Sequence, residues 1–162
     1  ITGIIGRREV MEAAQPTFIS STFWTERIGP AAALKTLEVM ERERSWERIT
    51  ETGNGVRRRW QELADAEGLA IDHWGLPSLC GFTFKSKNAQ AYKTLITQEM
   101  LAKGYLAGNS LYASLAHTED LLDRFFADLA PVFKTIRECE DGRDVRSLLK
   151  GPVAHSGFAR LN

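Results

Sequence analysis

The sequence predicts an α+β fold in which helices cover a small, few-stranded sheet and a long amphipathic helix precedes that layer. Three observations support this class. Apolar residues recur at helical spacing over 46–63, two short runs with strand character follow over 71–84, and further helical patterns alternate with an extended segment up to about 138. Elements in this order form a sheet covered by helices on one side.

The composition is typical of a globular domain and excludes several classes of function. The 162 residues carry 21 basic and 21 acidic side chains, so the zero net charge argues against a nucleic-acid partner. No apolar run approaches the roughly 18 residues that cross a bilayer. Cys80 and Cys139 are too few for a disulfide scaffold and lack metal-ligand spacing. We therefore expect a cytoplasmic protein with no metal site and no membrane partner.

The N-terminal part contains one anomaly. Residues 1–6 are β-branched and bounded by glycine, which predicts the end of a buried strand. Such a strand needs neighbours to pair with, so we interpret the chain as a fragment of a larger protein. A processed N-terminus that forms an edge strand is the alternative. A short helix over 7–14 ended by Pro16, an extended segment over 17–24 and a helix from about Glu26 are expected next.

The long helix is predicted from apolar residues and a glycine spaced three and four positions apart. Gly68 is expected to end this helix, and the three arginines at 57–59 are interpreted as a solvated face. The residues of the seam are Trp46, Ile49, Gly53, Val56, Trp60 and Leu63.

Two strands are then expected at 71–74 and 79–84, joined through 75–77, with Phe82 and Phe84 on the buried face. Asn88 is predicted to cap the following helix, and Gly104 to end it. The expected inner face of that helix is Tyr92, Leu95, Ile96 and Met100.

The last part of the sequence predicts an extended segment over 105–113, followed by a final helix capped by Thr118. Pro131 is expected to kink or shorten this helix, and the chain from Cys139 onward to lie irregularly on a surface. The predicted inner face of the helix is Leu122, Phe125, Phe126, Leu129 and Phe133.

Candidate chemistry is sparse when the residues are taken by themselves. Sequence motifs of serine hydrolases, zinc proteases and phosphate-binding loops are absent. We interpret His117 as a backbone hydrogen-bonding residue and Cys80 as a small buried side chain. Several hydroxyl side chains, including those of Ser21 and Thr22, precede a predicted helix, and this pattern predicts a phosphate-binding site. Simple capping of that helix by Thr22 or Thr25 is the alternative.

Several stretches match a known family in order along most of the chain. They are 6–11, 22–24 leading into 29–34, 104–106, and 115–120. On these residues the chain resembles the C-terminal part of a class III, pyridoxal-phosphate-dependent aminotransferase, most similar to the glutamate-1-semialdehyde 2,1-aminomutase group, whose members are isomerases. The resemblance implies the C-terminal domain of a fold-type I transferase and a small amino-acid-like substrate similar to glutamate-1-semialdehyde.

The resemblance also implies how the site is divided. Pyridoxal 5'-phosphate is the implied cofactor, and its Schiff-base lysine lies upstream of the segment matched by 6–8. The chain therefore holds no catalytic residue, and Lys35, Lys85 and Lys87 do not occupy the motif position. Thr22, with Ser21 beside it, is implied to reach the cofactor phosphate of the neighbouring subunit in a homodimer. Residues 23–27 depart from the common Thr-x-Ser-Gly-Asn-Pro pattern, which leaves the substrate class open.

We divide the chain into a large-domain remnant with the phosphate-contact loop (1–30), long connecting helices (31–68), a small α+β domain (69–138) and a surface tail (139–162). The expected function is that of an aminotransferase fragment, inactive alone. Two alternatives remain: a free-standing, non-catalytic binding or dimerisation module, or a class III transaminase for an amino sugar or an ω-amine.

Overall fold

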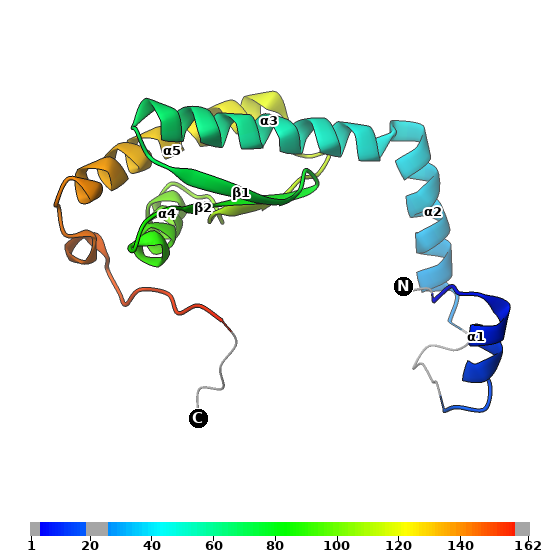
Figure 1. Cartoon of the computed structure of the whole chain (residues 1–162). Coiled ribbons are helices and arrows are strands. Elements are labelled where there is room, and N and C mark those ends of the chain that lie inside the picture. Colours follow the sequence, from blue (N-terminus) through cyan, green and yellow to red (C-terminus); the bar gives the residue numbers. More distant parts are fainter. Residues whose placement is uncertain (1–3, 19–25, 158–162) are drawn as a thin grey trace. The chain divides into compact units, whose positions relative to one another are not determined.

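The structure is a computed structural model that describes residues 4–18 and 26–157, and it divides into two units, Ile1–Ser45 and Trp46–Asn162 (Figure 1). The first unit contains helices α1 (Arg8–Ala14) and α2 (Ile28–Glu43), and neither helix buries a side chain. Residues 4–6 are irregular and exposed, so the strand predicted at 1–6 is not formed by its described half. No described segment pairs with them.

The first turn of helix α2 is stabilised by the side chain of Glu26, which lies just before the helix. The carboxylate of Glu26 accepts hydrogen bonds from the backbone N–H groups of Ile28 and Gly29, the latter at 2.9 Å. These donors would otherwise lack partners in the first turn. The predicted caps, Thr22 and Thr25, lie outside the described residues, whereas the helix start near Glu26 is confirmed.

The second unit holds nearly all of α3 (Ser45–Ala66), followed by strands β1 (Ile71–Leu76) and β2 (Leu79–Phe84). Helix α4 (Ala89–Ala102), strand β3 (Ser110–Tyr112) and helix α5 (Glu119–Glu140) follow. A short 3-10 helix, η1 (Val145–Leu148), comes last. The strands form an antiparallel sheet in the order β1-β2-β3, which confirms the predicted α+β class.

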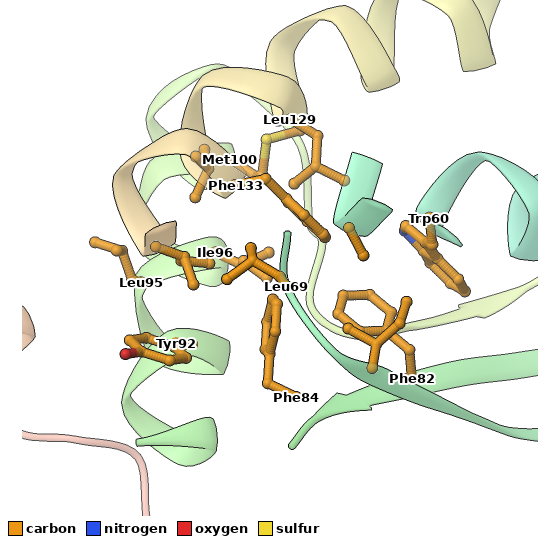
Figure 2. Close-up of a cluster of buried hydrophobic side chains, with 14 of the residues drawn as sticks. Trp60, Leu69, Phe82, Phe84, Tyr92, Leu95, Ile96, Met100, Leu129 and Phe133 are labelled. Atoms are coloured by element: carbon orange, nitrogen blue, oxygen red, sulfur yellow. The ribbon is translucent and has the colours of Figure 1, made fainter. Parts of the chain in front are cut away.

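One face of the sheet carries the core (Figure 2). The ring of Phe82 lies 4.9 Å from that of Trp60 on α3 and 5.9 Å from that of Phe133 on α5. Phe84 meets Tyr92 of α4 edge to face at 5.5 Å. Three helices therefore pack on the same face, and the predicted inner positions of α4 and α5 are buried as expected.

The other face of the sheet is left uncovered by the described residues. The pairing of Trp74 with Gly81 and of Leu79 with Tyr112 places these residues on it. The indole of Trp74 lies over Gly81, where a Cβ atom would overlap it. Leu76 and Tyr112 remain 71% and 73% exposed. We call this surface the outer sheet face.

A glycine lets the hairpin approach the long helix. Gly53, on α3, is buried, and a Cβ atom there would overlap the carbonyl oxygen of Pro77 in the β1–β2 turn. This contact explains why a glycine interrupts the apolar seam of the helix. Val56 and Trp60 of the same seam are fully buried, but Trp46 at its start is half exposed.

Three local predictions differ from the structure. β1 continues to Leu76, so the turn is shorter than expected. Helix α5 runs through Pro131 to Glu140, so the proline does not shorten it, because Phe133 and Ile136 beyond the proline are held in the core. Asn88 begins α4, but its side chain makes no capping bond.

The segment after residue 138 is more anchored than predicted. Cys139 and Val145 are buried, so the helix and the core extend into the region expected to be a surface tail. The side-chain amide of Gln98 donates to the carbonyl of Leu148 at 3.0 Å. Across the described residues, none of the helices is both long enough and apolar enough to cross a membrane.

Candidate functional site

Ser21 and Thr22, which the sequence predicts to bind phosphate, lie outside the described residues. The two residues therefore remain predicted phosphate ligands. The three lysines set aside on sequence grounds, Lys35, Lys85 and Lys87, are all exposed. Lys35 pairs with Glu38 at 2.6 Å and Lys85 pairs with Asp72 at 2.8 Å, both on exposed surface. No lysine lines either of the two hollows described next.

Two hollows flank a short loop between β3 and α5. We call residues 114–118 the His117 loop, because His117 lines both hollows. The first, the apolar cavity, has a volume of about 430 Å³ and lies between α3, the segment 104–112 and the start of α5. The second, the polar recess, has a volume of about 610 Å³ and lies between α3 and the His117 loop.

The imidazole of His117 is oriented by its own loop. The backbone N–H of Ser114 donates to Nδ1 at 3.0 Å, and the Ser114 hydroxyl oxygen lies 3.1 Å from the same nitrogen. A nitrogen that accepts a backbone N–H carries no proton, so Nε2 carries the hydrogen of the neutral ring. The prediction that His117 bonds the backbone is confirmed, and the residue lines both hollows.

The apolar cavity is walled by hydrophobic side chains and fixed by one polar anchor. The hydroxyl of Tyr105 donates to Asp128 at 3.0 Å, and Lys103 donates to the same carboxylate at 2.9 Å. The bond from Lys103 has the larger effect and that from Tyr105 the next largest, and together they hold the pKa of Asp128 below its ordinary value. Burial, followed by the bond to Asp128, raises the pKa of Tyr105, so its hydroxyl remains a donor. Its ring rests edge to face on Phe125, 5.4 Å away.

One of the residues that line the cavity has a buried donor without an acceptor among the described residues. Trp60 is 1% exposed, and its indole Nε1–H is buried with no hydrogen-bond partner among the described residues. Native structures leave few such groups unpaired. Sequence reasoning identified Trp60 only as a seam residue, because helical spacing carries no information about which polar atom finds a partner.

The polar recess presents charges of both signs. Arg58 and Glu51 line it from α3, and Thr118 and Glu119 line it from the start of α5. The Thr118 hydroxyl accepts the backbone N–H of Leu121 at 3.3 Å, as predicted for a cap. Facing carboxylates offset the cations, so the recess does not favour anions through net charge.

The arginine run at 57–59 is only partly a solvated face. Arg58 is exposed, but Arg59 donates to Asp123 on α5 at 2.8 Å and stacks over the ring of Phe126, 4.3 Å from its centre. The planar guanidinium joins the two helices in a way that the charge pattern alone did not indicate.

Two other titratable residues, Cys80 and His73, contribute to the packing and hydrogen bonding of the fold. Cys80 is fully buried, its thiol contacts the carbonyl of Gly53 at 3.8 Å, and burial raises the pKa of that thiol. A thiol kept protonated is a poor nucleophile, which agrees with the interpretation of Cys80 as a packing residue. His73 Nε2 lies 3.1 Å from the Gln61 side-chain oxygen, and burial lowers its pKa. Within 4–18 and 26–157, no three His, Cys, Asp or Glu side chains form a metal-binding group.

Comparison with known proteins identifies relatives of one chemical type, although no protein-family model matches the chain. It is 29% identical to the 3-aminobutyryl-CoA aminotransferase of Cloacimonas acidaminovorans over 147 residues, which is 85% of this chain and 33% of that protein. It is also 29% identical to a glutamate-1-semialdehyde 2,1-aminomutase of Neisseria meningitidis, covering 81% of this chain and 35% of the relative. A 2'-deamino-2'-hydroxyneamine transaminase of Streptomyces kanamyceticus is 25% identical, with 80% and 34% covered.

A solved structure shares the fold. The internal aldimine form of the FumI protein of Sphingopyxis sp. MTA144, which contains pyridoxal phosphate, superposes with a TM-score of 0.74 at 18% identity. The superposition covers 89% of this chain and 35% of that one. The predicted resemblance to part of the class III aminotransferases and the predicted fold are confirmed, and the chain spans about a third of the length of the relatives it matches.

Proposed function

We propose that this sequence is part of a pyridoxal-phosphate-dependent enzyme that transfers amino groups, with a substrate similar to glutamate-1-semialdehyde. One observation carries the proposal. Two aminotransferases and an aminomutase match at least 80% of the chain, yet the match occupies about a third of each of them. A segment so similar to one portion of these enzymes is best explained as the same portion of another.

The described residues do not form a complete cofactor site. Pyridoxal phosphate needs a lysine amine for its covalent link and donors for its phosphate, and when bound it serves as an electron sink. The hollows beside His117 contain no lysine, and Lys35 and Lys85 are occupied by carboxylates at the surface. We therefore propose that the covalent anchor belongs to another part of the enzyme and that this chain is inactive alone.

Within the whole enzyme, we propose that Thr22 and Ser21 contact the cofactor phosphate across a homodimer in the cytoplasm, with no nucleic-acid or membrane partner. The exposed apolar residues Leu76 and Tyr112 on the outer sheet face support the presence of further polypeptide against this unit. An isolated monomer rarely exposes a contiguous apolar patch without an interaction to serve.

The test compares the product of the complete reading frame with the 162-residue chain. Each is incubated with pyridoxal phosphate and assayed for the absorbance of a protein-bound aldimine and for amino transfer from glutamate-1-semialdehyde, an ω-amine and an amino sugar. We expect binding and turnover by the complete product only, with glutamate-1-semialdehyde preferred. Turnover by the 162-residue chain alone, or a complete product that binds no cofactor, would contradict the proposal.

Replacing one hydroxyl tests the phosphate role directly. In the complete product, Thr22→Ala should weaken cofactor binding by roughly 1–3 kcal/mol through loss of a charge-assisted hydrogen bond. Thr36→Ala is the matched control, because the Thr36 hydroxyl is exposed and donates to the carbonyl of Ala32 in its own helix, at 2.8 Å. An equal cofactor dissociation constant for the two variants would remove Thr22 from the site.

A second candidate substrate class follows from one relative. The similarity to the transaminase of Streptomyces kanamyceticus supports an amino-sugar substrate in place of glutamate-1-semialdehyde. The assay with glutamate-1-semialdehyde, an ω-amine and an amino sugar distinguishes these two substrate classes. A free-standing binding or dimerisation module is supported by the exposed apolar side chains of α2, and a complete product without amino transfer would favour it.

A further inference from the structure

The outer sheet face carries a contiguous apolar patch. Leu76 on β1 pairs with Leu79 on β2, and Leu79 pairs with Tyr112 on β3, so these three side chains form one row across the sheet. Trp74 lies on the same face of β1, because alternate residues of a strand point to the same side. Side chains that are paired or adjacent on one face of a sheet lie close enough to touch. We call Trp74, Leu76, Leu79 and Tyr112 the outer patch.

Part of the outer patch is a preformed platform. The indole of Trp74 lies over Gly81, and a Cβ atom at position 81 would fall 2.2 Å from Cζ2 of the indole. Gly81 is buried even though it belongs to the outer face of the sheet. A larger residue at this position would displace the ring, so the pairing of tryptophan with glycine sets the shape of the surface before anything docks on it.

The sheet presents little charge to an occupant of the outer patch. The three described strands contain one carboxylate, that of Asp72, and no lysine or arginine. The Asp72 carboxylate pairs with Lys85 at 2.8 Å. An occupant therefore gains free energy by covering apolar side chains, and it needs no charge complementary to the sheet.

The exposed area of the outer patch is small for an interface between two separate proteins. Trp74, Leu76 and Tyr112 are 42%, 71% and 73% exposed, which corresponds to roughly 400 Å² if a fully exposed large side chain presents about 150–250 Å². A stable interface between two proteins buries about 800 Å² on each partner. Interfaces between domains of one chain bury about 600–1,500 Å² in total, half of it on each side. The patch therefore fits a contact within one polypeptide.

Relatives of this chain contain the polypeptide that such a contact needs. The match to this chain occupies 33% and 35% of two curated relatives, and the shared fold occupies 35% of the chain of the solved structure. About two thirds of each of these polypeptides therefore lies outside the shared part. A domain of that size provides enough surface to cover the outer patch.

From these observations we propose that the outer patch is the surface on which the remaining part of the same enzyme polypeptide docks, through an apolar surface of its own. The inference rests on the proposed function in that this chain must be part of a longer enzyme. It assigns the outer patch to a contact within one subunit, whereas the proposed contact between subunits is made by Ser21 and Thr22.

The test is photo-cross-linking in the product of the complete reading frame. p-Benzoylphenylalanine, an aromatic residue that attaches to neighbouring C–H bonds on illumination, replaces Tyr112 on β3. Mass spectrometry after digestion identifies the attached peptide, and a denaturing gel shows whether the cross-link joins one chain or two. We expect a cross-link to a peptide outside the 162 residues, on a species that migrates as a single chain.

Two further positions control the experiment. The photo-reactive residue at Leu76, in the same row of the sheet, should reach the same region of the polypeptide as the one at Tyr112. Lys134 is the matched control, because it is exposed on α5, which packs on the opposite face of the sheet. The photo-reactive residue at Lys134 should not reach that region.

Four results would overturn the inference. A cross-linked species of twice the chain mass would assign the outer patch to a second copy, and a cross-link to residues 1–45 would assign it to the first unit. No cross-link from either Tyr112 or Leu76 would mean that nothing covers the patch, and an equal cross-link from Lys134 would mean that the reaction is not specific to it. Cross-linking needs neither bound cofactor nor turnover, so failure of this inference is distinguishable from failure of the proposed function.

Discussion

The two units of this chain each contain a long helix that carries apolar side chains, but only one of these helices is buried. Helix α2, in the first unit, buries no side chain and leaves Leu34 and Leu37 at 71% and 60% exposed. Helix α5, in the second unit, buries eight residues along one face. The difference shows that an apolar stripe specifies a need for a partner surface but does not supply one. The second unit contains its partners within the described chain, in the sheet and in α3 and α4.

The largest effect on the free energy of unfolding should come from truncating a buried side chain of α5, because α2 contains no buried side chain. Phe133 is fully buried and its ring contacts those of Phe82 and Phe84 at 5.9 and 5.5 Å. Phe133→Ala should lower the free energy of unfolding by about 3–5 kcal/mol, measured by urea denaturation. Leu37→Ala in α2 is the control and should change it by no more than about 0.5 kcal/mol. Similar losses in both variants would mean that the two helices are packed alike.

The contrast can be sharpened inside α3, where two glycines two residues apart should respond with opposite sign. Gly53→Ala forces a methyl group against the Pro77 carbonyl and should destabilise the fold by about 1–3 kcal/mol. Gly55→Ala meets only the Arg58 guanidinium at 3.9 Å, so it should stabilise the helix by about 0.5–1 kcal/mol. The melting temperatures of the two variants, measured by thermal unfolding, test whether the two stability changes have opposite sign. A stabilising Gly53→Ala would show that the hairpin does not rest on α3.

The smallest effect concerns a polar contact at the edge of the core. Glu140 accepts hydrogen bonds from Ser86 at 2.6 Å and from Tyr92 at 2.5 Å, and these hold the pKa of Glu140 below its ordinary value. Tyr92→Phe should cost about 1 kcal/mol at neutral pH, reduced by the exposure of Glu140 to solvent.

The same contact predicts a pH dependence. The fold favours the ionised form of Glu140, so its contribution is complete above the ordinary glutamate pKa and is lost as the pH falls through the lowered value. Unfolding free energies measured from about pH 6 to about pH 3 should fall less steeply for Tyr92→Phe than for the unmodified chain. Parallel curves would contradict a role for this bond.

Helical and strand periodicity predicted most of the second unit. The inner positions of α4 and α5, the hairpin and the Thr118 cap follow from spacing and local chemistry, because these signals act within a few residues. The continuation of α5 past Pro131 to the buried Cys139 was not predicted. It depends on the packing of Phe133 and Ile136 against residues of other elements, which outweighs a local helix-breaking signal.

The candidate site divides in the same way. Ser21 and Thr22 came from a local cluster of hydroxyls and from the family resemblance, and they remain predictions. The two hollows beside His117 were not predicted, since they are bounded by residues far apart in the chain, such as Trp60 and Phe125. No local pattern reports which distant side chains will enclose a space.

By itself, the sequence determined the class of the fold, the approximate positions of most helices and strands in the second unit, and the resemblance to part of an aminotransferase, because each depends on residue order and periodicity. Only the tertiary structure decided that Gly53 is the contact point for the hairpin. It also decided that, among residues 4–18 and 26–157, nothing covers the outer sheet face and no acceptor reaches the indole N–H of Trp60. These properties arise when the helices close on the sheet, since burial and hydrogen-bond pairing are set by neighbours in space rather than by neighbours in the chain.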